Sequence, residues 1–355
     1  RCSRDWSSDV CSSDLVGVDV SKSTFDAALA EGGQGGCQPL GKLPARCFSR
    51  SPEGVAELLA WLRASGVAPE SARVVMEATG RYSVELAAWV AQACPPLSPA
   101  IESPRQTVAF IKSLGLRNKT DRMDARALAL YGVERRPRAY QPPPASEGEL
   151  RELVRYRDFL VQQKVAAGNR AEEMRDSKFI QREMRRQIRQ LERDIEKTEK
   201  EMARVKQATP ELENDIALMT SIYGVAFLTA ATIRAELGDL RRFEKARQLT
   251  AFAGLNPSLR QSGSSVRGRT HISKAGNPRV RRALYLSAMV AVRGDNDFRH
   301  DYERLRAQGL SKMAALCAIM RKILVLMRAL LISGKPYVPL WKNRPQLQEK
   351  MFLEA

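Results

Sequence analysis

Four carboxylates are placed where they could hold a divalent cation. Asp19 and Glu77 each end a short apolar run, and Asp121 and Asp124 lie three positions apart. Buried strands at the two runs would deliver Asp19 and Glu77 to a sheet edge, and a helix would present the other two acids on one face. Mg²⁺ prefers such oxygen ligands, and Mn²⁺ is accepted by similar sites. The four acids therefore predict a Mg²⁺ site in which Mn²⁺ is also possible.

A carboxylate site of this kind suits phosphodiester chemistry, because two ions about 3.5–4 Å apart can clamp the attacking and leaving oxygens. Each acid also has a simpler explanation. Asp19 could cap a turn, Glu77 could be a surface acid, and Asp121 with Asp124 could favour a helix start. The residues around the acids favour the metal site, because Glu77 leads into Gly80 and a basic stretch precedes Asp121.

A serine-rich loop is the second candidate for chemistry. Ser262 opens the run SGSS, and Arg260, Arg267 and Arg269 flank it. Guanidinium groups could hold the non-bridging oxygens of a scissile phosphate, while an activated serine could attack its phosphorus. From the residues alone, a flexible turn or a phosphate-binding nest remains open.

The charge of the chain favours a polyanionic partner. Lys and Arg number 58 against 40 Asp and Glu, which gives a net charge of +18 and a pI of about 9.9. Nucleic acid is the leading candidate. Residues 245–293 carry ten Lys or Arg and no acid. The cations that we expect to contact nucleic acid are Arg260, Arg267, Arg269, Lys274, Arg279, Arg281 and Arg282.

A glycine turn adds a weaker candidate for phosphate contact. Residues 218–237 resemble one half of a helix-hairpin-helix, in which the turn at Gly224 and the next helix's N-terminus would meet a phosphate. Simple packing of the turn between two helices explains this pattern equally well.

Composition excludes several other classes. Six cysteines show no CxxC pair and there are only two histidines, so neither a disulfide framework nor a zinc site is supported, and a cytoplasmic location is expected. The apolar segment 313–332 is interrupted by Arg321, Lys322 and Arg328. These residues are costly within a bilayer, so we expect a packed helix and no membrane partner.

The elements that would position these residues follow from composition. Between residues 16 and 133, strand-like runs at 16–20 and 73–76 alternate with helical patterns at 54–64 and 84–93, which is typical of an α/β domain with a mixed sheet. A proline-rich basic stretch at 135–144 ends this region.

A charged helical region follows at 146–207. Apolar positions there step by four and three, the spacing of a coiled-coil seam. We expect either an intramolecular helical hairpin or self-association, with Gly168 and Asn169 dividing two helices. The seam comprises Met184, Ile188, Leu191, Ile195, Thr198, Met202 and Val205.

The predicted organisation has five parts. Residues 9–15 (DVCSSDL) resemble a translated sequencing-adapter end, and we interpret residues 1–15 as non-native sequence. A genuine disordered, serine-rich tail is the alternative. Residues 16–140 form the α/β domain, 146–207 a coiled-coil linker, 211–340 a mainly α-helical C-terminal domain, and 341–355 a tail.

Six motifs give the chain a family resemblance. In order along the sequence, they are VGVDVSK at 16–22, MEATGRY at 76–82, LRNKTDRMDARALA at 116–129, AFAGLNP at 251–257, QSGSSVRGR at 261–269 and ISKAGNPRVRR at 272–282. Together they resemble the insertion-sequence transposases of the IS110 family, and the resemblance extends from residue 16 to about residue 339.

The resemblance implies an RNase H-like N-terminal domain whose acids Asp19, Glu77, Asp121 and Asp124 bind Mg²⁺, followed by a C-terminal serine transposase domain. It implies that Ser262 cuts and rejoins donor and target DNA through a phosphoserine, with Ser264 and Ser265 as the fallback nucleophiles. It also implies a homo-oligomer, dimer or tetramer, that is guided by a structured RNA.

Two other functions remain open from the sequence. A metal-dependent nuclease or junction resolvase would use the DEDD acids alone, with the Ser262 loop only gripping phosphate. A non-enzymatic DNA-binding protein would use neither. An actin-like ATPase is disfavoured, because the chain lacks a glycine-rich adenosine loop and carries a high positive charge.

Overall fold

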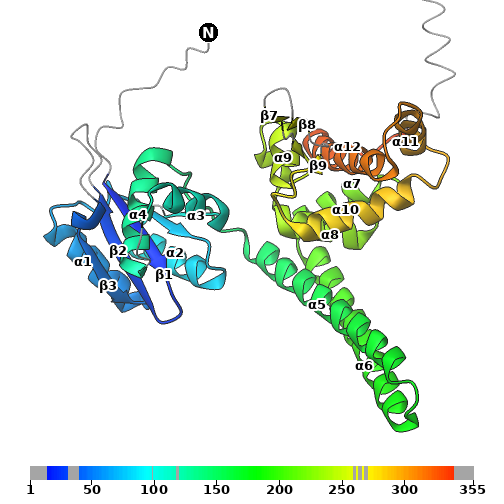
Figure 1. Cartoon of the computed structure of the whole chain (residues 1–355), viewed down its shortest axis with the longest axis horizontal. Helices are drawn as coiled ribbons and strands as arrows, with labels where there is room; N and C mark the ends of the chain where they lie inside the picture. The colour runs from blue at the N-terminus through cyan, green and yellow to red at the C-terminus, as the bar shows by residue number, and fades with distance from the viewer. Residues whose placement is uncertain are drawn as a thin grey trace, which may run out of the picture. The chain divides into compact units, whose positions relative to one another are not determined.

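The computed structural model describes residues 14–30, 40–97, 99–116, 120–258, 261–262, 266–267 and 271–339. The chain divides into two compact units, residues 1–142 and 143–355, which are described separately (Figure 1).

A five-stranded mixed sheet forms the centre of the first unit. The strands are β1 (Leu15–Val20), β2 (Thr24–Ala30), β3 (Ala45–Ser49), β4 (Arg73–Glu77) and β5 (Pro99–Glu102), in the order β3-β2-β1-β4-β5. The β1–β2 and β2–β3 pairs are antiparallel, while β1–β4 and β4–β5 are parallel. The mixed α/β fold expected from the sequence is therefore confirmed for this region. Leu15, which we had assigned to the non-native segment, is the first residue of β1 and is buried.

Side chains of β1 point alternately to the two faces of the sheet and so contribute to two separate hydrophobic cores. Val16 and Val18 pack with Leu58 of α1 (Pro52–Ala64) and Leu86 of α2 (Arg81–Ala93). On the other side, Leu15 packs with residues of α3 (Pro104–Ser113) and α4 (Asp121–Arg135). Successive strand residues point to opposite faces, so Asp19 shares the α4 face with Leu15. A short 3₁₀ helix, η1 (Leu40–Lys42), precedes β3.

The α4 helix lies very close to β1 because small residues meet there. A Cβ at Gly17 would lie 2.1 Å from both the Ala125 carbonyl oxygen and the Ala129 amide nitrogen. Only glycine permits this backbone approach. The close contact brings the first turn of α4 near the end of β1, where Asp19 lies.

The second unit is mainly helical. Two long helices, α5 (Ala145–Glu173) and α6 (Lys178–Ala208), pack along each other as a hairpin (Figure 1). The remaining helices are α7 (Pro210–Thr220), α8 (Phe227–Leu237), η2 (Leu240–Arg242), α9 (Ala246–Phe252), α10 (Pro278–Ala291), α11 (Asp297–Ala307) and α12 (Lys312–Ser333). Two short antiparallel pairs join β6 (Pro257–Ser258) to β9 (His271–Ile272) and β7 (Gln261–Ser262) to β8 (Val266–Arg267).

The hairpin accounts for the heptad seam within one chain. Thr198, Met202 and Val205 are buried, and the four earlier seam residues are half-buried. Ion pairs Arg157–Glu199 and Lys164–Glu192 also join the two helices. The coiled coil as a self-association element is not confirmed. The predicted break at Gly168 is wrong, because α5 continues through that residue to Glu173.

The α12 helix belongs to the core of this unit, as expected for residues 313–332. Its residues Ile319, Ile323 and Met327 are almost fully buried among α7, α9 and α10. Among the described residues, no helix is long and apolar enough to span a bilayer.

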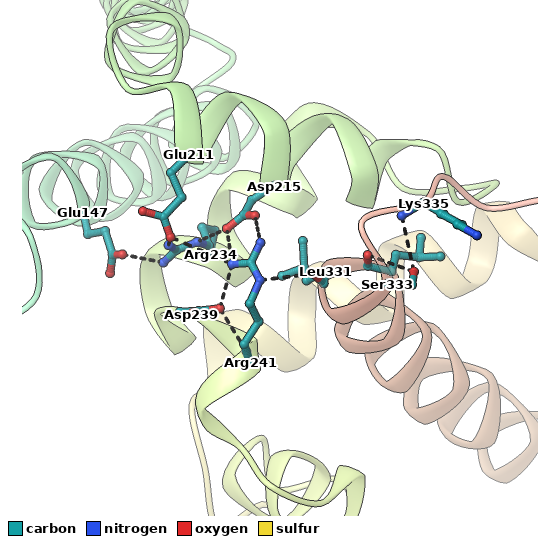
Figure 2. Close-up of polar contacts among 10 residues, drawn as sticks. Glu147, Glu211, Asp215, Arg234, Asp239, Arg241, Leu331, Ser333 and Lys335 are labelled. Atoms are coloured by element: carbon teal, nitrogen blue, oxygen red, sulfur yellow. Dashed lines mark hydrogen bonds and ion pairs between the residues drawn. The ribbon is translucent and has the colours of Figure 1, made fainter.

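A buried ion cluster joins the hairpin to the other helices (Figure 2). Arg234 of α8 is 1% exposed and contacts Asp215 of α7, which is fully buried, through a 3.0 Å bond from Nε to Oδ2. Its Nη1 lies 2.7 Å from Oε1 of Glu147, in the first turn of α5. Arg241 also pairs with Asp215 and donates to the Leu331 carbonyl of α12. The cluster thus ties together five elements, α5, α7, α8, η2 and α12.

Candidate active site

The four acids predicted from the sequence line one cleft in the first unit. The cleft holds about 330 Å³, and Asp19, Glu77, Asp121 and Asp124 all lie on its wall. The rest of the wall is formed by Val108, Ile111, Lys112, Leu116 and Leu128. The four acids thus lie together as their positions in the sequence predicted, although residues 19 and 124 are far apart in the chain.

Local structure explains how each acid reaches the cleft. Asp19 lies near the end of β1 and Glu77 is the last residue of β4. Thr120 caps α4 by accepting a 3.3 Å hydrogen bond from the Met123 amide. Asp121 and Asp124 therefore lie in the first helical turn, where the helix dipole favours negative charge.

Thr107 fixes one of the acids. Its hydroxyl is fully buried on α3 and donates a short hydrogen bond to Oε2 of Glu77. A half-buried carboxylate held by such a bond keeps one orientation. Thr107 could not be recognised from the sequence, because a threonine inside a helix carries no signal of its partner.

Burial and neighbouring negative charges perturb the pKa of Asp19. Burial, followed by the charges of Asp121, Asp124, Glu77 and Asp26, raises the pKa of Asp19 from 3.8 to about 6. Clustered carboxylates resist full ionisation unless a cation or a proton neutralises them. The cleft is therefore electrostatically suited to a positively charged ligand.

Asp26 is the second residue that the sequence did not reveal. It lies directly across from Asp19 in the β1–β2 ladder, and Nε of Arg122 is 3.6 Å from its Oδ1. Lys112 is the third, because it is the cation on the wall of the cleft. Both become visible only when the strand register and the α3 position are known.

The donor chemistry fits a hard cation, since carboxylate oxygens are what Mg²⁺ and Mn²⁺ accept. The distances between the acid side chains fit a bound ion less well. Within the described part of the chain, no three Asp, Glu, His or Cys side chains converge closely enough to hold an ion. Side-chain rotation toward an ion would be needed to close the site.

The predicted nucleophile lies in the second unit. Ser262 is in β7, opposite Val266 of β8 in the register. Arg267 is also in β8. Arg260, Arg269, Ser264 and Ser265 lie outside the described residues. The structure thus places a short β ladder where the sequence predicted a loop.

The four cations near α10 have different surroundings. Lys274 and Arg282 are exposed. Nε of Arg279 lies 3.2 Å from Oδ2 of Asp158 on α5. Arg281 donates a 2.7 Å hydrogen bond to the Gly276 carbonyl, and burial lowers its pKa. Lys274 and Arg282 are therefore accessible to a partner. Arg279 and Arg281 also make contacts within the fold.

Gly224 has a packing role. Its φ is +85°, and a Cβ there would lie 2.8 Å from the Ser287 carbonyl oxygen and the Ala291 amide nitrogen of α10. Close approach between the α7–α8 turn and α10 therefore accounts for the glycine. Contact with a phosphate at this turn stays a prediction.

Comparison with known proteins gives two family matches. The DEDD transposase model of the IS110 group matches residues 16–180, and the model described as "Transposase IS116/IS110/IS902 family" matches residues 216–303. They occur in order and include the acid cleft and the α10 region respectively.

Individual relatives agree with the family matches. The pilin gene-inverting protein of Moraxella bovis is 29% identical over 324 residues, which cover 91% of this chain and 97% of that protein. The transposase for insertion sequence element IS1111A of Coxiella burnetii is 27% identical over 249 residues, covering 62% and 66%. The solved structure of Thermus thermophilus RuvC aligns with 36% of this chain and 99% of its own at 16% identity, with a TM-score of 0.26, and nothing further rests on it.

An α/β domain with an acid-lined cleft, joined to a basic helical domain, is the arrangement of a DNA-processing enzyme. The chain belongs to the IS110/IS116/IS902 family of transposases. This confirms the family resemblance inferred from the six motifs.

Proposed function

We propose that this transposase cuts and rejoins DNA through a covalent phosphoserine at Ser262, with the acid cleft as the second half of the active site. The observation that carries the proposal is the convergence of Asp19, Glu77, Asp121 and Asp124 on one cleft, together with the raised pKa of Asp19. Such a cluster is costly to maintain unless it binds a cation.

In this scheme the four acids hold Mg²⁺, or Mn²⁺, which supplies electrostatic stabilisation to the oxygens of the scissile phosphate. Thr107 keeps Glu77 oriented, and Lys112 offers a positive charge to a phosphate oxygen at the cleft wall. Because residues in the cleft carry much negative charge, DNA would enter only once that charge is neutralised.

The proposed covalent step conserves a phosphodiester bond. The Ser262 oxygen attacks phosphorus and forms a serine–phosphate ester, while one strand leaves as a deoxyribose hydroxyl that takes up the serine proton. Attack by another strand's hydroxyl reverses this exchange and returns the serine. Each step breaks one P–O bond and forms one, so rejoining needs no external energy source.

The proposed partners are donor and target DNA, a structured guide RNA and further copies of the chain. The basic segment 245–293 is compatible with binding to a nucleic-acid backbone. The Moraxella bovis relative is named for inverting a gene, which is a cut-and-rejoin reaction. By analogy, we propose a conservative recombination chemistry for this chain. The RNA and the oligomer rest on the family resemblance.

The test is a search for a covalent protein–DNA adduct. The protein is expressed together with the element's flanking non-coding RNA and a plasmid carrying its junction. We expect an adduct that requires Ser262 and Mg²⁺ and disappears in Ser262→Ala. An adduct that persists in Ser262→Ala but not in Ser264→Ala would transfer the role to the second serine.

A DEDD nuclease or junction resolvase is the second candidate function. It is favoured by one observation: all four acids lie within residues 1–142. Mg²⁺-dependent strand cleavage by Ser262→Ala at the wild-type rate, with no adduct in either protein, would establish it. Loss of every activity in Ser262→Ala, with retained metal binding, would exclude it.

A further inference from the structure

The turn between α5 and α6 carries a cluster of positive charge that the proposed chemistry does not use. Five cations line a surface cleft of about 380 Å³ there, together with Gln181. We call them the tip cluster, and they are Arg175, Lys178, Arg182, Arg185 and Arg189.

The spacing gathers the cations on one side of α6. Lys178, Arg182, Arg185 and Arg189 step by four, three and four residues, so they follow one face of the helix. Like charges at these separations destabilise a helix. A helix that keeps four of them in a row therefore needs an anionic partner to offset their repulsion.

The acids of the protein do not provide that partner. Arg182 lies 3.6 Å from Glu183. Within the part of the chain that the structure describes, the other four members of the tip cluster form no ion pair and no side-chain hydrogen bond. Among the described residues, Glu183 is thus the one acid that forms an ion pair with the five cations of the tip cluster.

The second half of the same helix shows the contrast. Residues 178–191 contain five Lys or Arg and one acid, whereas residues 192–208 contain five of each. In the latter half, Lys200 pairs with Glu196, Arg204 with Glu201, and Lys206 with Glu213 of α7. A need for solubility would explain a mixture of positive and negative charges along the helix. It would not explain why positive charge is concentrated in the first half.

The tip is also held in a fixed shape. Ser177 caps α6 by accepting from the Ile180 amide, and the Gln181 side chain donates to the Met174 and Ala171 carbonyls of the preceding turn. The cations therefore project from a closed turn, so less order has to be gained on binding.

An exposed aromatic ring completes the surface. Phe179 is 64% exposed, and the Arg182 guanidinium lies 5.5 Å from its ring centroid. Cations that track phosphates, combined with an aromatic ring on which a base can stack, are the features of single-strand binding sites. A duplex has its bases stacked internally and would use the cations alone.

We propose that the tip cluster and Phe179 form a binding site for a single-stranded stretch of nucleic acid, in which the cations contact phosphates and Phe179 stacks on an unpaired base. The site is separate from the acid cleft and from Ser262. Its existence does not depend on the phosphoserine chemistry.

The test uses the full-length protein and labelled oligonucleotides of equal length as single-stranded DNA, single-stranded RNA and duplex DNA. Binding is followed by fluorescence anisotropy over a salt series. The tip variant replaces Lys178, Arg182, Arg185 and Arg189 with Gln. The matched control replaces Lys197, Lys200, Arg204 and Lys206 with Gln, which removes the same charge from the same helix.

We expect the tip variant to bind single strands at least about tenfold more weakly, with a salt slope reduced by about 3, because each lost phosphate contact in a single strand contributes about 0.7. The control should bind nearly as the unmodified protein does. Equal losses in both variants would overturn the proposal, because they would reflect only net charge.

A second part of the experiment tests Phe179. Phe179→Ala should weaken single-strand binding roughly tenfold and leave duplex binding unchanged, since stacking on an unpaired base is lost. Phe179→Tyr keeps the ring and should retain affinity. A single-strand affinity that is unaffected by Phe179→Ala would overturn the single-strand assignment. The stronger of the DNA and RNA responses identifies the natural strand, and either one supports the site.

Discussion

Asp19 in the folded domain ionises only near pH 6. Burial and four neighbouring acids raise its pKa from 3.8, so the folded state holds an extra proton between those two values. Stability should therefore fall as pH rises from about 4 to 6, and the full cost is present above pH 6. In metal-free buffer, Asp19→Asn should raise the Tm at pH 7.5 by a few degrees.

The comparison is made by thermal unfolding at pH 7.5 and at pH 4. At the lower pH the carboxyl of Asp19 is already protonated, so the variant and the parent should unfold together. The exposed acid Glu57, changed to Gln, serves as the control for a simple loss of negative charge. An identical gain at both pH values would show that the ionisation of Asp19 is not the cause.

Thr107 should matter for metal binding more than for the fold. Thr107→Val keeps the shape but removes the hydroxyl that orients Glu77. Loss of a partner that orients a metal ligand typically lowers metal affinity roughly 10–100-fold. A Mn²⁺ titration would detect this change, and Thr107→Ser should restore the affinity. If Thr107→Val binds Mn²⁺ as well as the parent does, the hydrogen bond has only a packing role.

Residue types and their positions in the chain were enough to place all four acids in one cleft, because each follows a buried strand or opens a helix. Asp26 was not recognised, since its importance depends on the register that sets it opposite Asp19. Lys112 was missed for the same kind of reason. Single residues are predictable where local patterns position them, and they are missed where only pairing between elements does so.

At the scale of elements, the contact between α4 and β1 decides whether the acid cleft exists. A Cβ at Gly17 would collide with backbone atoms of α4, which cannot move aside like a flexible side chain. Gly17→Ala should therefore cost about 3 kcal/mol or more, at the upper end for overpacking. Urea denaturation measures the change. Gly41→Ala is the control, because nothing lies within 4 Å of a Cβ there, and an equal effect would contradict the packing argument.

The ion cluster around Arg234 should dominate the stability of the second unit. Arg234→Met removes the ion-pair partner of the buried Glu147 and leaves the fully buried Asp215 with Arg241 alone. Removing one partner of a buried pair typically costs about 3–5 kcal/mol. Denaturant unfolding should show this loss, whereas Arg299→Met, which breaks an exposed pair with Glu303, should change little.

The sequence predicted helices and strands unevenly. Runs rich in Val and Leu gave β1, β4, α1 and α2, but β2 was missed because its sequence, TFDAALA, is rich in alanine. The heptad seam predicted α6 correctly, yet it could not tell a partner helix in the same chain from one in another copy. Gly168 was a misleading break, because the true turn is fixed by the Ser177 cap and by Gln181.

At the scale of the whole molecule, the proposed active site is divided between two compact units, with the acids in residues 1–142 and Ser262 in residues 143–355. Both halves must meet for the proposed reaction. If they meet between different copies of the chain, two inactive variants should complement each other. A mixture of Ser262→Ala and Asp124→Asn chains can then build one complete site, from the acids of the first and the serine of the second.

If both halves come from the same chain, no such mixture contains a complete site, and the mixture should form no adduct. The measurement is the yield of covalent protein–DNA adduct from co-expressed, differently tagged chains, with each variant alone as the baseline. We expect adduct only on the Asp124→Asn chain, because only that chain carries the serine. Adduct on the Ser262→Ala chain would contradict the assignment of the nucleophile, and no adduct in any mixture would place both halves of the site in one chain.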